Sequence, residues 1–128
     1  MKKKNWLFWL LVVIAAMTAV TGAVQAIAPA FVLHFVGAQI TKTSQHFFAI
    51  VGMFMVLFGG ATLQALLSVK HHPIVIFWSS LQKFGASVAV ALSVMNGVFS
   101  SLAVVVAVVD FLSGVLAIAY WLRIRREG

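Results

Sequence analysis

The sequence predicts an all-α integral membrane protein, a four-helix transmembrane bundle with a short interfacial segment between its first and second helices. Hydrophobic residues make up 63% of the 128 residues and charged residues only 9%, so the chain lacks the polar side chains that cover a soluble domain. The apolar residues form four runs, each near the roughly 20 residues that cross a bilayer as a helix. Most basic residues lie at the ends of these runs, where they orient the spans.

The four runs occupy nearly all of the chain, so we expect residues 1–128 to form one transmembrane domain. We place the spans at about 5–28, 46–69, 74–95 and 102–122. The first run could also be a secretory signal with a small-residue cleavage site at Val24-x-Ala26. A retained span is favoured, because the run is long for a signal and Trp6 and Trp9 fit a membrane-interface belt.

The segments between the runs predict the connections. Pro29 ends the first run, and residues 30–36 are too few to cross, so they form an interfacial helix or a re-entrant turn. Residues 41–45 are the most polar stretch and are expected to be a loop, in which Ser44 could cap the next helix. The short turn at Asn96-Gly97 makes the last two spans antiparallel neighbours.

The distribution of basic residues predicts the orientation. With four spans, Lys42 stands alone on one side of the membrane, and both termini and the His71-His72 turn lie on the more basic side. The basic residues on that side are Lys2, Lys3, Lys4, Lys70, Arg123, Arg125 and Arg126. By the positive-inside rule, that side is the cytoplasm. Because the basic residues form no interleaved patch, we expect no nucleic-acid partner.

One pair of charges lies inside the apolar segments. Lys83 is about ten residues into the third span, or roughly 15 Å along its axis. Asp110 is the only acidic residue in the apolar body and lies near the middle of the fourth span, at a similar depth. An isolated charge at the centre of a bilayer costs roughly 2.5–3.5 kcal/mol or more, so the two side chains are expected to pair.

Helical spacing places small residues on the face of Asp110, at Ala103, Ala107, Gly114 and Ala117, and bulky residues on the other faces. The charge pair and nearby polar side chains could therefore line a pocket in the cytoplasmic half of the bundle. The expected pocket residues are Gln64, Ser79, Ser80, Gln82, Ser87 and Ser113. Two interpretations stay open: the pair fixes the register of two helices, or it forms a protonatable or ligand-contacting site.

Enzyme and metal chemistry are disfavoured. The chain has no cysteine, no catalytic fingerprint and no second acidic residue in its apolar body, so we expect no catalytic residue, cofactor or metal. The adjacent His71-His72 do not converge on one face of a helix. His34 and His46 flank a loop that has no carboxylate, so membrane anchoring is their expected role.

Several residues together resemble the layout of a known group of proteins. They are Pro29, Gly52, Gly59-Gly60, His72-Pro73, Lys83, Asp110 and Tyr120. With the hydropathy and loop lengths of most of the chain, they look like small four-helix bacterial inner-membrane proteins, DoxX-like in the broad sense. The resemblance implies a four-helix bundle in a bacterial inner membrane and supplies no activity.

Three functions remain as hypotheses. The leading one is a non-enzymatic accessory or assembly partner in the bilayer, which binds a membrane protein partner, a second copy of itself, or a lipid or other apolar ligand between its helices. The second is a proton-coupled carrier of a small solute that uses Lys83 and Asp110, in a dimer because four helices are few for a translocation path. The third is an enzyme acting on an apolar substrate, with Lys83 as base or Schiff-base former.

Overall fold

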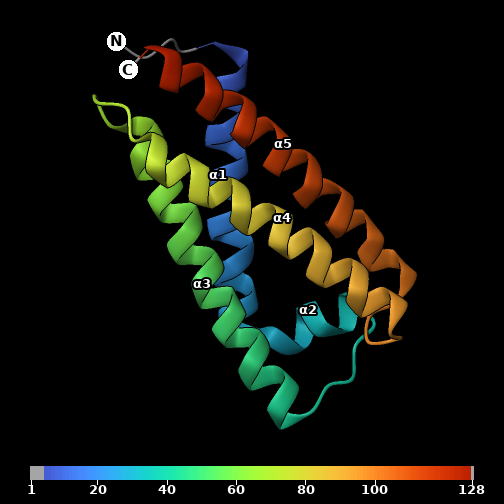
Figure 1. Cartoon of the computed structure of the whole chain (residues 1–128). Coiled ribbons are helices and arrows are strands. Elements are labelled where there is room, and N and C mark those ends of the chain that lie inside the picture. The colour runs from blue at the N-terminus through green and yellow to red at the C-terminus, as the bar shows by residue number, and fades with distance from the viewer. Residues whose placement is uncertain (1–4, 128) are drawn as a thin grey trace.

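The computed structural model describes residues 5–127, and this part of the chain is helical with no strand (Figure 1). The predicted fold class is confirmed, since four of the helices are long and apolar enough to cross a membrane. The helices are α1 (Trp6–Ile27), α2 (Pro29–Phe35), α3 (Lys42–Leu67), α4 (Pro73–Met95) and α5 (Val104–Glu127), with a short 3-10 helix, η1 (Ser101–Ala103), before α5. The predicted interfacial segment corresponds to α2. Lys2, Lys3 and Lys4 lie outside the described residues.

The start of α3 differs from the prediction. Residues 41–45 were expected to be a loop, but Thr41 is the N-cap and the helix begins at Lys42. The Thr41 side chain accepts a hydrogen bond from the Ser44 backbone N–H, and the Ser44 hydroxyl accepts one from the Thr41 backbone N–H. This capping box satisfies N–H groups that have no partner within the helix, so the helix extends to these polar residues.

The last helix is also longer than predicted, because α5 continues past Leu122 to Glu127. The guanidinium carbon of Arg125 lies 4.9 Å from the centre of the Trp121 ring, one turn earlier on the helix. Such a cation–π contact stabilises this final turn at an exposed position. At the other end of the α4–α5 hairpin, Gly97 has φ +74°, a backbone conformation that glycine adopts without steric cost.

The helices form two closely packed pairs, α1 with α3 and α4 with α5, and the contacts between the pairs are fewer. Figure 1 shows that α1 begins and α5 finishes at one end of the molecule, here called the terminal end, and that the pairs separate toward the opposite, α2 end. The buried apolar cluster lies at the terminal end, and its most completely buried large side chains are those of Phe8, Leu66, Ile76 and Tyr120. The four spans therefore share a core at only one end.

Helix α2 lies across the open end. The Ser100 backbone N–H, in the turn between α4 and α5, donates a 2.7 Å hydrogen bond to the carbonyl of Val36, just after α2. The rings of Phe48 and Phe99 meet edge to face, with centroids 6.2 Å apart. These contacts connect the two helix pairs at the α2 end.

Small residues set the distance between α1 and α3. A Cβ atom built on Gly59 would lie 2.7 Å from the backbone nitrogen of Ala19, and one built on Gly22 would lie 2.7 Å from the carbonyl oxygen of Gly52. Neither gap can hold a side chain. Small residues therefore let α1 and α3 pack closely at these positions. Gly60 of α3 is different, because a Cβ atom built on it would have nothing within 4 Å.

Candidate functional site

The two charged side chains of the apolar segments lie close together. Nζ of Lys83 is 3.7 Å from Oδ1 of Asp110, and the two side chains are 14% and 17% exposed. Lys83 lies in the middle of α4 and Asp110 in the first half of α5, and the two helices run antiparallel. The hairpin thus brings both charges to one level, as helix lengths alone predicted.

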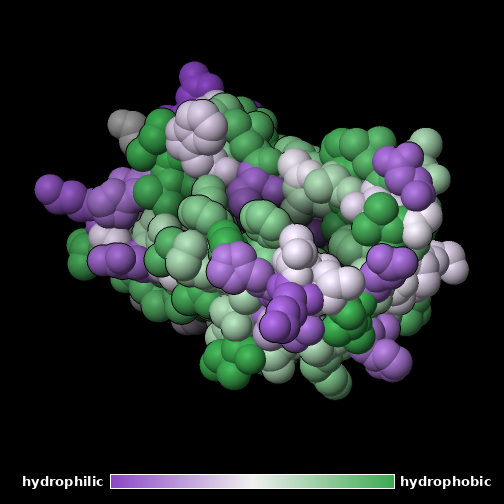
Figure 2. Space-filling view, turned by 90° about the horizontal axis from the view of Figure 1, so that it is seen from below, coloured by the Kyte–Doolittle hydropathy of each residue, from purple (hydrophilic) through white to green (hydrophobic). Residues whose placement is uncertain are grey.

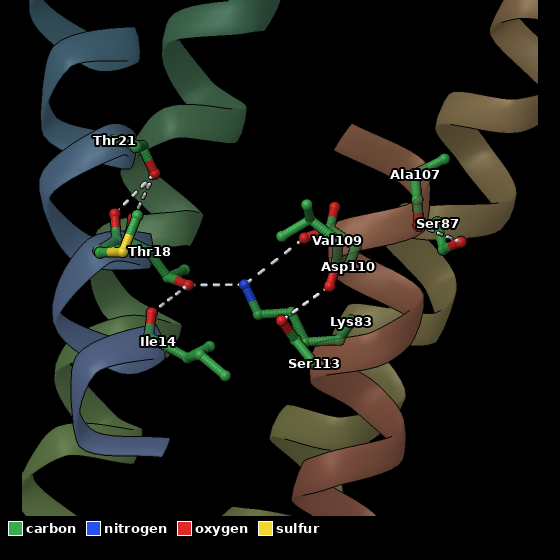
Figure 3. Close-up of polar contacts among 10 residues, drawn as sticks. Ile14, Thr18, Thr21, Lys83, Ser87, Ala107, Val109, Asp110 and Ser113 are labelled. Atoms are coloured by element: carbon green, nitrogen blue, oxygen red, sulfur yellow. Dashed lines mark hydrogen bonds and ion pairs between the residues drawn. The ribbon is translucent and has the colours of Figure 1, made fainter. Parts of the chain in front are cut away.

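A threonine from the other helix pair completes this arrangement. Nζ of Lys83 donates a 2.6 Å hydrogen bond to Oγ1 of Thr18 on α1, and the Thr18 hydroxyl donates to the carbonyl of Ile14 at 2.9 Å (Figure 3). Hydrogen bonds to charged groups contribute about 1.5–3 kcal/mol. Lys83 therefore connects the α4–α5 pair to the α1–α3 pair midway along the molecule.

Two of the serines predicted to line the pocket, Ser80 and Ser87, lie instead in the interface between α4 and α5. Ser80 donates to the carbonyl of Gly114 at 2.9 Å, and Ser87 donates to the carbonyl of Ala107 at 2.8 Å. Both bonds join α4 directly to α5. They form because the small residues at 107 and 114 let the two backbones approach, which leaves these serines in the helix interface and outside the pocket.

Gln64 also lies outside the pocket. It is exposed in the last turn of α3, so its amide can reach the membrane surface. The distance between its side chain and the Lys83–Asp110 pair could not be inferred from the sequence. That distance depends on how α3 is rotated about its axis, and the glycine contacts with α1 set this rotation.

The remaining predicted residues surround a cavity of about 30 Å³ between the two helix pairs. Its polar lining consists of Thr18, Thr62, Ser79, Gln82, Lys83 and Ser113. The Ser113 hydroxyl donates to the carbonyl of Val109 in its own helix at 2.8 Å, so it presents only its lone pairs to the cavity. A space of this volume holds about two water-sized groups.

An apolar groove adjoins the cavity. It lies between α3 and α4, has a volume of about 200 Å³, and is lined by Phe58, Ala61, Ile74, Val75, Trp78 and Ser79. Phe58 and Ser79 line both spaces. Trp78 forms one wall of this groove. The groove opens sideways, since Ile74 and Trp78 are more than half exposed.

A second polar region faces the α2 end. Viewed from that end, the surface is indented between two masses, and hydrophilic atoms lie in the indentation (Figure 2). Gln25 on α1 is buried and donates a 3.0 Å hydrogen bond to the carbonyl of Phe48 on α3. This hydrogen bond joins the two helices of the α1–α3 pair near the α2 end.

Two residues of the site were not expected from the sequence. These residues are Thr18 and Thr62, which line the cavity. Thr62 donates to the carbonyl of Phe58 in its own helix at 2.8 Å and is hydrogen-bonded to Ser79 across the helix pairs. A threonine in a transmembrane helix satisfies its hydroxyl locally, so its sequence gives no sign of a partner on another helix.

The described residues contain no group of three or more His, Cys, Asp or Glu side chains that could hold a metal ion. His72 instead forms a 3.0 Å hydrogen bond with Ser68 in the turn between α3 and α4. In comparisons with known proteins, no family model, no curated protein and no solved structure matches this chain.

Proposed function

We propose that this protein is a non-enzymatic accessory protein of the membrane that binds a lipid, or another apolar ligand with a polar group, between α3 and α4. The observation that carries the proposal is that the apolar groove and the polar cavity share two lining residues, Phe58 and Ser79. An apolar chain in the groove has its polar end beside Ser79 and directed toward Lys83.

Affinity at such a site has to come from the polar group. Lipid tails are as apolar as the side chains of the groove, so burying a chain there gains little from the hydrophobic effect. Hydrogen-bonding groups inside the hydrocarbon layer do not compete with bulk water and therefore distinguish a polar-headed ligand from the surrounding lipid. Thr62, Ser79, Gln82 and Lys83 provide these groups at the inner end of the groove.

The accessory role is supported by the surfaces that a partner protein can contact. The α3–α4 turn and the stretch from α2 to α3 are short, so contacts with a partner protein or a second copy involve chiefly the membrane-facing helices. The carrier hypothesis has less support, because a cavity of about 30 Å³ is smaller than most solutes.

Blocking the groove tests the proposal. We expect Ala61→Trp to fill the apolar groove and to reduce co-purified lipid at least tenfold, measured by native mass spectrometry of protein released from nanodiscs. Ala89→Trp is the matched control, since Ala89 is an exposed alanine on α4 that does not line the groove. Equal lipid retention by both variants, or a wild-type protein that carries no lipid, would contradict the proposal.

The orientation is part of the same proposal. We propose that the terminal end lies in the cytoplasm of a bacterial cell, because Lys70, Arg123, Arg125 and Arg126 gather there and Lys42 is at the opposite end. The chain has no cysteine, so single cysteines report position without background.

With a membrane-impermeant maleimide added to spheroplasts, we expect immediate labelling of Gln39→Cys and labelling of Val69→Cys only after permeabilisation. Both positions are exposed, at opposite ends of the bundle. The reverse order of labelling would overturn the orientation and leave the ligand site unaffected.

A further inference from the structure

The cavity lining specifies a chemical class of ligand. Resting on the proposed function, we infer that the site takes a neutral lipid with a hydroxyl group, such as a long-chain alcohol or a diacylglycerol, in preference to an anionic lipid.

The first argument is charge. The titratable groups at the cavity are Lys83, which lines it, and Asp110, whose Oδ1 lies 3.7 Å from the lysine nitrogen. Their formal charges cancel. A carboxylate or phosphate beside Lys83 would also approach the Asp110 carboxylate, and that repulsion acts in a medium that screens charge weakly.

The second argument is size and depth. A volume of about 30 Å³ accepts one or two oxygen atoms and excludes a phosphate with four oxygens and its ester chains. Ser79 is the seventh residue of α4, which starts at Pro73, so it lies about 9 Å along the helix from the terminal end. A phospholipid keeps its phosphate at the membrane surface, above this level, whereas a hydroxyl on a hydrocarbon chain can reach it.

The third argument is the hydrogen-bond pattern. Thr62 has a single hydroxyl proton, which it donates to the carbonyl of Phe58, so Ser79 donates in the bond between Ser79 and Thr62. Oγ of Ser79 is left with lone pairs that accept. The Gln82 amide lines the cavity and makes no hydrogen bond to another described side chain or backbone group, so its NH₂ is free to donate.

A hydroxyl group matches both partners, because it donates to Oγ of Ser79 and accepts from the Gln82 NH₂. An ester or ketone oxygen only accepts, and it leaves the serine lone pairs without a donor. An ionised carboxylate has the same deficiency and adds the charge conflict with Asp110.

The test uses four probes that share the same type of C18 chain and differ in head group: oleyl alcohol, methyl oleate and oleate, with one chain each, and dioleoylphosphatidylglycerol, with two. Lipid that co-purifies with the full-length protein is removed before the protein is placed in nanodiscs. The four probes are then added together, so that they compete for the site, and bound lipid is measured by native mass spectrometry. We expect oleyl alcohol to bind about tenfold more tightly than the other three. Gln82→Leu should lower that preference about fivefold, and Gln82→Glu, whose carboxylate cannot donate, should not restore it. Thermal unfolding of each variant shows that it folds.

Preference for oleate or the phospholipid, or a preference for the alcohol that Gln82→Leu leaves unchanged, would overturn the inference while the lipid site of the proposed function stands. If the wild-type protein binds the four probes equally and Ala61→Trp abolishes that binding, the inference is also overturned and the proposed lipid site still stands. Binding of none of them, together with no effect of Ala61→Trp on co-purified lipid, would instead refute the proposed function.

Discussion

Replacing Lys83 with methionine while Asp110 remains should lower the free energy of unfolding by about 3–5 kcal/mol, because removal of one partner leaves a buried charge without compensation. The side chain of Asp110 is only 17% exposed, and its Oδ1 lies 3.7 Å from Nζ of Lys83. The variant also loses the 2.6 Å hydrogen bond from Lys83 to Thr18, the polar link between the two pairs at this level.

The double variant Lys83→Met, Asp110→Asn separates these two contributions. It removes both charges and should recover most of the stability, since neutral pairs of similar volume are tolerated well. The free energy of unfolding that the double variant still lacks relative to the wild type should equal the loss caused by Thr18→Val, which removes only the hydrogen-bond acceptor on α1. Thermal unfolding in detergent micelles, followed by circular dichroism, measures all four proteins. Lys70→Met, in the exposed turn between α3 and α4, is the control for loss of a positive charge. A double variant as unstable as the single one would show that the charges do not compensate each other.

The second large effect is expected at Gly52. A Cβ atom there would lie 2.6 Å from the backbone nitrogen of Ala26 and 2.6 Å from the carbonyl oxygen of Gly22, and backbone atoms cannot rotate away as a side chain can. Gly52→Leu should therefore force α1 and α3 apart and lower the free energy of unfolding by about 3 kcal/mol, the upper end of the usual range for overpacking.

Gly60→Leu is the matched control. It places the same side chain on the same helix, where nothing lies within 4 Å, and should change stability by no more than about 0.5 kcal/mol. The two variants are compared by the temperature at which α-helical signal is lost. Equal loss in both variants would mean that leucine in place of glycine disturbs α3 for a reason other than contact with α1.

Most of the fold could be predicted from the sequence, because an uninterrupted apolar run can satisfy its backbone in lipid only as a helix. The bulky residues predicted to face lipid on the last span, among them Val105, Phe111 and Leu112, are all exposed, and Ala103 and Ala107 are buried against α4. The start of α3 was missed because Thr41 and Ser44 are equally typical of loops and of helix caps.

The site was predicted less completely. The two charges stand out in apolar spans, so Lys83 and Asp110 could be found from composition alone. Thr18 and Thr62 could not, because their role depends on how the α1–α3 pair faces the α4–α5 pair. That relation depends on the end at which the shared core lies, and this leaves no periodic signal in the sequence.

The account depends on Lys83 facing Asp110 between the two helix pairs, and one distance tests it directly. Asp110 is the only aspartate in the chain, so protein labelled with ¹³C at aspartate Cγ and with ¹⁵N at lysine Nζ contains a single carbon position to observe. In lipid bilayers, solid-state NMR should detect dipolar dephasing of that carbon by the lysine nitrogen, because Cγ is bonded to the Oδ1 atom that lies 3.7 Å from Nζ, and Lys83→Met should abolish it. A carbon signal without dephasing, or dephasing that persists in Lys83→Met, would contradict the account.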